Sequence, residues 1–130
     1  MFFLPYHFRR QALTPFRVDI DHGPNGKFSP RTWELDELKS VVEKWQTFMY
    51  ANDGWNALYL ENHDQPRSVD RFASSSPEHL HHSSTMLATF LGCQAGTVFI
   101  YQGQELGMCN VPEHWGIEQY KDLDCVNHHA

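Results

Sequence analysis

Apolar residues recur at helical spacing between residues 36 and 50. The positions that stack on one face at 3.6 residues per turn are Leu38, Val41, Val42, Trp45, Phe48 and Met49. Asp36 and Glu37 stand at the start of this stretch, where negative charge suits the positive end of the helix dipole. The pattern predicts an amphipathic helix over 36–50, which Asn52-Asp53-Gly54 ends by turning the chain.

The spacing changes to a period of two in residues 55–62, which predicts a strand. Leu58 and Leu60 would lie on one face and Tyr59 on the other. A second continuous apolar run, residues 97–101, is β-branched and aromatic, as in strands buried on both faces.

A helix is predicted between these strands, from about Pro77 to Cys93. Serine before the helix and proline at its first position both suit the unsatisfied amides there, which favours Ser76 as the cap. The predicted buried positions are Leu80, Met86, Leu87, Phe90 and Leu91. Helix, strand, helix, strand is the repeating unit of a parallel α/β fold. A short helical pattern follows over about 117–126.

Composition narrows the classes of protein. A hydrophobic content of 41% suits a packed interior, and a net charge of −6 provides no basic stripe for nucleic acid. Residues 1–16 lack the apolar core of a signal peptide, and no run approaches the roughly 20 apolar residues of a membrane-spanning helix. Cys93, Cys109 and Cys125 form no Cys-x-x-Cys pair, so we expect reduced thiols and a cytoplasmic location.

The polar triplet Asn62-His63-Asp64 ends the predicted strand 55–62 and is followed by Gln65-Pro66-Arg67. Alone, such a triplet is weak evidence, because Asn and Asp are favoured in turns. A second motif follows one helix length later, Gly96-Thr97-Val98-Phe99-Ile100-Tyr101-Gln102-Gly103-Gln104-Glu105. Strand ends are where barrel enzymes carry their catalytic residues.

These motifs resemble the α-amylase-type enzymes of glycoside hydrolase family 13. The triplet is similar to their seventh-strand signature, and Gln-Pro-Arg to that of the α-glucosidase, maltase and oligo-1,6-glucosidase branch. The second motif is similar to their eighth-strand pattern Gly-x-Pro-x-Ile-Tyr-x-Gly-x-Glu, with Val98 in place of proline. The resemblance covers residues 18–127 and implies about strands 6 to 8 of a (β/α)8 barrel. A whole barrel takes about 250 residues, so we expect a C-terminal barrel portion over 18–130 after an unmatched segment, 1–17.

The resemblance also implies site roles. Asp64 would be the carboxylate that stabilises the oxocarbenium-like transition state, and His63, with Asn62, would bind the sugar. Arg67 would either line the substrate pocket or form an ion pair that fixes its loop. Structural roles remain open for His63, as a ring bonded to a neighbouring strand, and for Asp64, as a loop cap. Glu105 is expected to be structural.

The nucleophile and the acid/base are expected to be absent, since the family carries them on the fourth and fifth strands. Phe16-Arg17-Val18-Asp19 is similar to the fourth-strand signature Gly-Phe-Arg-x-Asp. However, three strand-helix repeats take about 90 residues, and Asp19 lies only 45 residues before Asp64. We therefore place Asp19 at the end of the sixth strand. An isolated chain of this kind is expected to be inactive, with exposed sheet edges.

Other interpretations remain. The same fold serves as a non-enzymatic partner subunit in relatives of this family, and the intact triplet favours the enzyme. A metal-dependent hydrolase using His63 and Asp64 is a further alternative. His79, His81 and His82 do not share one helix face, so they predict no zinc site. No ion or cofactor is expected, and the expected partner is a small α-glucoside.

Overall fold

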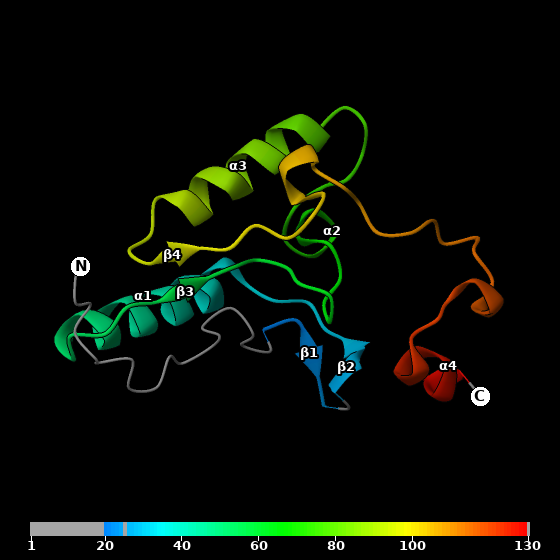
Figure 1. Cartoon of the computed structure of the whole chain (residues 1–130), viewed down its shortest axis with the longest axis horizontal. Coiled ribbons are helices and arrows are strands. Elements are labelled where there is room, and N and C mark those ends of the chain that lie inside the picture. Colours follow the sequence, from blue (N-terminus) through cyan, green and yellow to red (C-terminus); the bar gives the residue numbers. More distant parts are fainter. Residues whose placement is uncertain (1–19, 25, 130) are drawn as a thin grey trace, which may run out of the picture.

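The computed structural model describes residues 20–24 and 26–129, and it contains two small sheets and several helices (Figure 1). In chain order the elements are β1 (His22–Gly23), β2 (Gly26–Pro30), α1 (Leu35–Ala51), β3 (Ala57–Leu58), α2 (Ser68–Phe72), α3 (Leu80–Gly92), β4 (Thr97–Val98), the 3-10 helices η1 (Gln104–Leu106) and η2 (Ile117–Gln119), and α4 (Leu123–His129).

β3 and β4 form a parallel pair, in the register Ala57 with Thr97 and Leu58 with Val98. The segment between them carries α2 and α3, so the unit is a strand-helix-strand crossover (Figure 1). This confirms the predicted helix, strand, helix, strand order for α1, β3, α3 and β4. The ladder itself is shorter than the predicted strands 55–62 and 97–101, since pairing is limited to two residues on each strand.

The core lies on one side of the β3–β4 pair. Leu58 and Leu60 are 0% and 1% exposed and form one cluster with Val69, Leu87 and Leu91. Partly buried residues from α1, α2 and α3 pack against this cluster. They include Leu38, Val42, Phe72, Leu80 and Phe90. The predicted period of two is confirmed, because both leucines point to the same, helix-covered face. Burial of this apolar surface holds α1 and α3 against the strands.

Several positions predicted to be buried are exposed. Phe48 of α1 and Met86 of α3 are 52% and 49% exposed. The prediction that residues 97–101 form a strand buried on both faces is wrong, because Phe99 and Ile100 are 54% and 62% exposed. Within residues 20–24 and 26–129, β4 pairs only with β3, so its second edge and much of its surface meet no other strand.

The start of α3 also differs from the prediction. The helix begins at Leu80 with His79 at the cap position, and His79 makes no side-chain capping hydrogen bond. Ser76 contributes through its backbone instead, since its carbonyl accepts the N–H groups of His79 and Leu80, both at 2.9 Å. Residues 77–79 therefore form a turn that leads into the helix, and Pro77 is not its first residue.

Three elements were not predicted or differ in extent. The sequence pattern predicts no element at α2, nor the antiparallel β1–β2 hairpin. Its turn signal is Pro24-Asn25-Gly26, and Gly26 adopts a φ of 82°, which a side chain would disfavour. Instead of one short helix over 117–126, the structure has the 3-10 helix η2 followed by the helix α4.

No helix in the described part of the chain is both long enough and apolar enough to cross a membrane.

Candidate active site

The carboxyl ends of β3 and β4 lie at the same edge of the sheet. Thr97 donates its N–H to the carbonyl of Asn56 and Phe99 donates to that of Leu58, both at 2.8 Å. Because the strands are parallel and adjacent, the chain leaves both of them on the same side. The segments 59–67 and 101–110 are thereby placed next to each other, which is where the polar motifs lie.

Asn62, His63 and Asp64 form a tight turn beyond β3. The side-chain oxygen of Asn62 accepts the N–H of Asp64 at 2.9 Å, and its carbonyl accepts the N–H of Gln65 at 3.3 Å. This self-contained turn requires no contact from the carboxylate of Asp64. That side chain is 55% exposed, and the imidazole of His63 is 77% exposed, with Nε2 at 3.4 Å from Oδ1 of Asp64.

Neither structural alternative for His63 and Asp64 describes these contacts. His63 has its neighbouring Asp64 as the partner within ion-pair distance, not a group on an adjacent strand. The cap of the turn is Asn62, since its side chain accepts the Asp64 N–H. An anion near solvent at a strand end is available to a ligand, and it would interact favourably with a developing cation.

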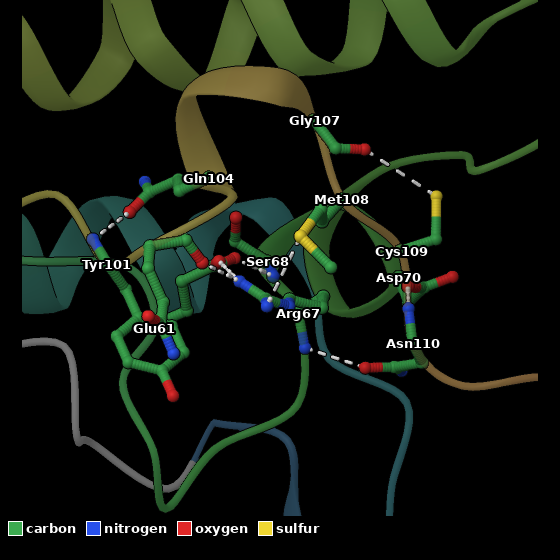
Figure 2. A network of polar contacts seen from close by, with 11 residues as sticks. Glu61, Arg67, Ser68, Asp70, Tyr101, Gln104, Gly107, Met108, Cys109 and Asn110 are labelled. Carbon is green, nitrogen blue, oxygen red and sulfur yellow. Dashed lines mark hydrogen bonds and ion pairs between the residues drawn. The ribbon is translucent and has the colours of Figure 1, made fainter.

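Arg67 lies at the end of this loop and points back toward the sheet (Figure 2). Its Nη1 donates to Oε1 of Glu61 at 2.8 Å and to the carbonyl of Gln102 at 2.7 Å. The guanidinium carbon lies 5.1 Å from the ring centre of Tyr101, in cation–π geometry. Of the two roles left open for Arg67, the ion pair that fixes the loop is therefore present in the structure.

The same region is linked by further contacts to the loop after η1. Asn110 accepts a hydrogen bond from the backbone N–H of Arg67 through Oδ1 at 2.7 Å, and the backbone N–H of Asn110 donates to the carboxylate of Asp70 at 2.6 Å (Figure 2).

Nearby, burial raises the pKa of the Cys109 thiol, and the negative charge of Asp70 adds to this rise. A thiol of raised pKa is a poor nucleophile, so Cys109 does not offer covalent catalysis.

A hollow of about 300 Å³ lies beside the two strand ends, on the face away from the leucine core. Its walls come from β3 and the residues after it, and from the stretch after β4: Ala57, Tyr59, Glu61, Asn62, Phe99, Ile100 and Tyr101. Of the four predicted site residues, only Asn62 borders this hollow. His63 and Asp64 stand at the loop tip, and Arg67 is held at the loop base by Glu61.

Other predicted residues lie apart from this site. Glu105, in η1, is exposed and is not among the labelled residues of the polar network in Figure 2. Asp19 falls outside the described residues. Over the described ranges, no three His, Cys, Asp or Glu side chains converge in a way that could hold a metal ion. The rings of His81 and His82 contact each other edge to face, with their centroids 5.7 Å apart.

Sequence reasoning did not find Glu61. Its side chain is 1% exposed, and both oxygens are used, since Oε2 accepts the N–H of Ser68 at 2.6 Å. A signal was available: an acidic residue in a mostly apolar strand, on the same face as Tyr59, needs a buried partner. The partner itself could not be identified without knowing how the loop folds back.

Comparison with known proteins gives a consistent result. Residues 4–128 match the family model described as "Alpha amylase, catalytic domain". This match begins inside the segment 1–17, for which the sequence shows no resemblance to the family, and the boundary at residue 17 stays a prediction. The chain is 44% identical to an α-glucosidase of Schizosaccharomyces pombe over 123 residues, which is 92% of its length. It is 47% identical to an oligo-1,6-glucosidase of Parageobacillus thermoglucosidasius over 110 residues, which is 85% of its length.

Solved structures agree with the sequence matches. The trehalose-6-phosphate hydrolase of Bacillus licheniformis superposes on 88% of this chain with a TM-score of 0.78 and 36% identity. The chain spans only about a fifth of the relatives' length, 21% and 19% of the two glucosidases and 20% of the solved hydrolase.

Proposed function

The chain belongs to the α-amylase catalytic-domain family, glycoside hydrolase family 13, and from this premise we propose that it supplies the transition-state-stabilising part of an α-glucosidase active site. The substrates would be small α-glucosides of the maltose and isomaltose type, cleaved with retention. The observation that carries the proposal is the position of Asp64, exposed on a turn beyond the carboxyl end of a parallel strand pair.

The solved relatives are barrel enzymes of the same family, and this chain corresponds to part of them. We propose that β3 and β4 are the seventh and eighth strands of such a barrel, with α1 as the sixth helix and α3 as the seventh. The residues before β1 would then end the sixth strand, and the barrel portion would run from residue 18 to residue 130. The parallel β3–β4 register and the crossover through α3 support this placement.

Each residue of the triplet has a role in the proposal. Positive charge develops at the anomeric carbon when the glycosidic bond breaks, and the carboxylate of Asp64 would stabilise that charge more than the neutral substrate. His63 would donate a hydrogen bond to a hydroxyl of the same sugar, and Asn62 would border the sugar while its side chain shapes the turn. Arg67 would form a wall of the site, with its guanidinium held by Glu61 and Gln102.

The chain by itself would be catalytically inactive. A retaining glycosidase needs a nucleophile and an acid/base about 5–5.5 Å apart across the scissile bond. In the described residues, the carboxylate next to Asp64 in sequence is Glu61, which is buried and engaged with Arg67 and Ser68.

A cytoplasmic location is part of the proposal. The three cysteines are thiols and are not joined by disulfides, which suits a reducing compartment. The net charge of −6 gives no electrostatic basis for a nucleic-acid partner, whereas a neutral sugar needs none.

An exchange of segments tests the proposal. The matching 110-residue stretch of the P. thermoglucosidasius oligo-1,6-glucosidase, 47% identical, would be replaced by the corresponding residues of this chain. We expect the chimera to release p-nitrophenol from p-nitrophenyl α-glucoside and the chain alone to release none. Activity of the chain alone would contradict its proposed inactivity. A folded chimera that binds no glucoside would contradict the proposed function.

A further inference from the structure

We propose that Glu61 is a positioning residue that closes the base of the Asn62-His63-Asp64 loop and ties it, through Arg67, to the segment that follows β4. The inference rests on the proposed function, because the loop is the one that carries Asp64. It adds a residue that sequence reasoning did not select and whose carboxylate is already engaged by Arg67 and Ser68.

The closure is made by the two oxygens of one carboxylate. Oε1 of Glu61 accepts from Nη1 of Arg67 at 2.8 Å, and Oε2 accepts from the backbone N–H of Ser68 at 2.6 Å (Figure 2). Glu61 directly precedes the triplet, whereas Arg67 and Ser68 follow Pro66. The residues between them are therefore held as a closed loop, and bonds to a charged group are stronger than those between neutral groups.

Arg67 extends the closure to the second strand. The same Nη1 donates to the carbonyl of Gln102 at 2.7 Å, and the guanidinium lies over the ring of Tyr101. The backbone N–H of Arg67 is accepted by the side chain of Asn110 at 2.7 Å. The position of the loop after β3 is thus defined relative to the segments after β4 and η1, and not only by its own turn.

Burial shields the pair from water, and both oxygens of Glu61 are engaged. The side chains of Glu61 and Arg67 are 1% and 17% exposed, so water competes little for their bonds. The side chain of Asp64 is 55% exposed and has no such buried partner. A group that must face a ligand cannot be fixed by burial of its own atoms, so its position depends on the supporting shell.

The experiment compares the full chain with Glu61→Gln, which keeps the shape of the side chain but removes its charge. The matched control is Glu105→Gln, at an exposed glutamate outside the network. Backbone order parameters from ¹⁵N relaxation would be measured at His63, Asp64 and Leu87. We expect Glu61→Gln to lower the order parameters of His63 and Asp64 from about 0.85, typical of rigid backbone, to below about 0.6, while Leu87 keeps its value.

A merely structural role gives a different result. If Glu61→Gln lowers the unfolding midpoint but leaves the order parameters of His63 and Asp64 at those of the control, the inference is overturned. Arg67→Met removes the nitrogen that donates to both Glu61 and Gln102, so the same loss of order is expected. If both variants are unfolded while Glu105→Gln is folded, the Glu61–Arg67 pair is required for folding, and the positioning role is rejected.

Sugar binding separates this inference from the proposed function. The cationic glucose analogue 1-deoxynojirimycin would be titrated into the chain and followed through the amide signals of His63 and Asp64. If the chain binds it, Glu61→Gln should weaken binding by about 10-fold or more, because small misplacements of a site are costly. Unchanged affinity would overturn the inference. No binding by the unaltered chain would count against the proposed sugar site, and the order parameters would still decide the role of Glu61.

Discussion

Arg71 donates two hydrogen bonds to the carboxylate of Asp21, at 2.6 and 2.7 Å, across a sequence separation of 50 residues. The two side chains are 5% and 18% exposed. The carbonyl of Arg71 also accepts the indole N–H of Trp33 at 3.3 Å. This pair joins the residue before β1 to α2, which directly follows the loop of the candidate site, so it anchors the segment into which the loop leads.

The first prediction concerns acid stability. Burial raises the pKa of Asp21, but the hydrogen bonds and the charge of Arg71 lower it by more, so the net pKa lies below the ordinary 3.8. A carboxyl with a lowered pKa in the folded state stabilises the fold above its unfolded pKa, and this stabilisation is lost as the pH falls through the folded pKa. We expect Asp21→Asn to reduce the free energy of unfolding at pH 7, and the difference between the two proteins to shrink as the pH falls below 3.8 and through the lowered folded pKa.

Urea unfolding followed by circular dichroism at a series of pH values measures this difference. A constant difference between the two proteins down to the lowest pH would contradict the prediction, because it would show that the charge of Asp21 is not involved.

The second prediction concerns the other member of this pair. Arg71→Met leaves the Asp21 carboxylate without its cation, and we expect a loss of about 3 kcal/mol in the free energy of unfolding. The matched control is Arg31→Met, which removes the exposed pair of Arg31 with Glu37. That loss should be clearly smaller, because water screens exposed pairs. Equal losses in urea titrations would show that burial of the Asp21–Arg71 pair is not what matters.

The third prediction concerns the approach of β4 to β3. Gly96 has a φ of 157°, and a Cβ added there would lie 2.7 Å from the carbonyl oxygen of Asn56. That carbonyl accepts the N–H of Thr97 at the start of the ladder, so Gly96→Ala should separate the strands. We expect a loss of about 1–3 kcal/mol, typical of a residue held in a disfavoured conformation.

Gly92 provides the control for this change. It lies in α3, and an added Cβ would meet nothing within 4 Å. Gly92→Ala should therefore stabilise the chain by about 0.4–1 kcal/mol, since alanine favours the helix and restricts the unfolded chain. Thermal unfolding of both variants tests the sign. A stabilising Gly96→Ala would show that the strands tolerate a wider separation.

How far the fold could be predicted depended on whether the information was local. The presence of α1 and α3 follows from periodicity within one segment, although α3 begins at Leu80 and not at Pro77. The position of Asn62-His63-Asp64 follows from its place after an alternating strand. The exposure of Phe99 and Ile100 could not be read from their composition, because burial of a strand depends on which other strands lie beside it. Local pattern predicts an element, but its neighbours decide its environment.

The charged pairs show the same limit for the candidate site. Asp21 and Arg71, or Glu61 and Arg67, carry no mark in the sequence that joins them, because many opposite charges occur in this chain. The fold determines which charges pair, because it buries two opposite charges side by side, and a buried charge is costly unless it is paired. The resemblance identified the residues that would face the sugar, and the structure adds the residues that hold them.

The final prediction concerns Asp64 in the chimeric oligo-1,6-glucosidase. Asp64→Asn keeps the size of the side chain but removes the negative charge that would stabilise the glucosyl cation. Because this charge acts mainly in the transition state, kcat should fall by about 10²–10³ while KM changes little. Glu105→Gln in the same chimera should leave both constants unchanged. Steady-state kinetics on p-nitrophenyl α-glucoside distinguish the cases: a raised KM with unchanged kcat would make Asp64 a ground-state binding residue, and unchanged constants would remove it from the site altogether.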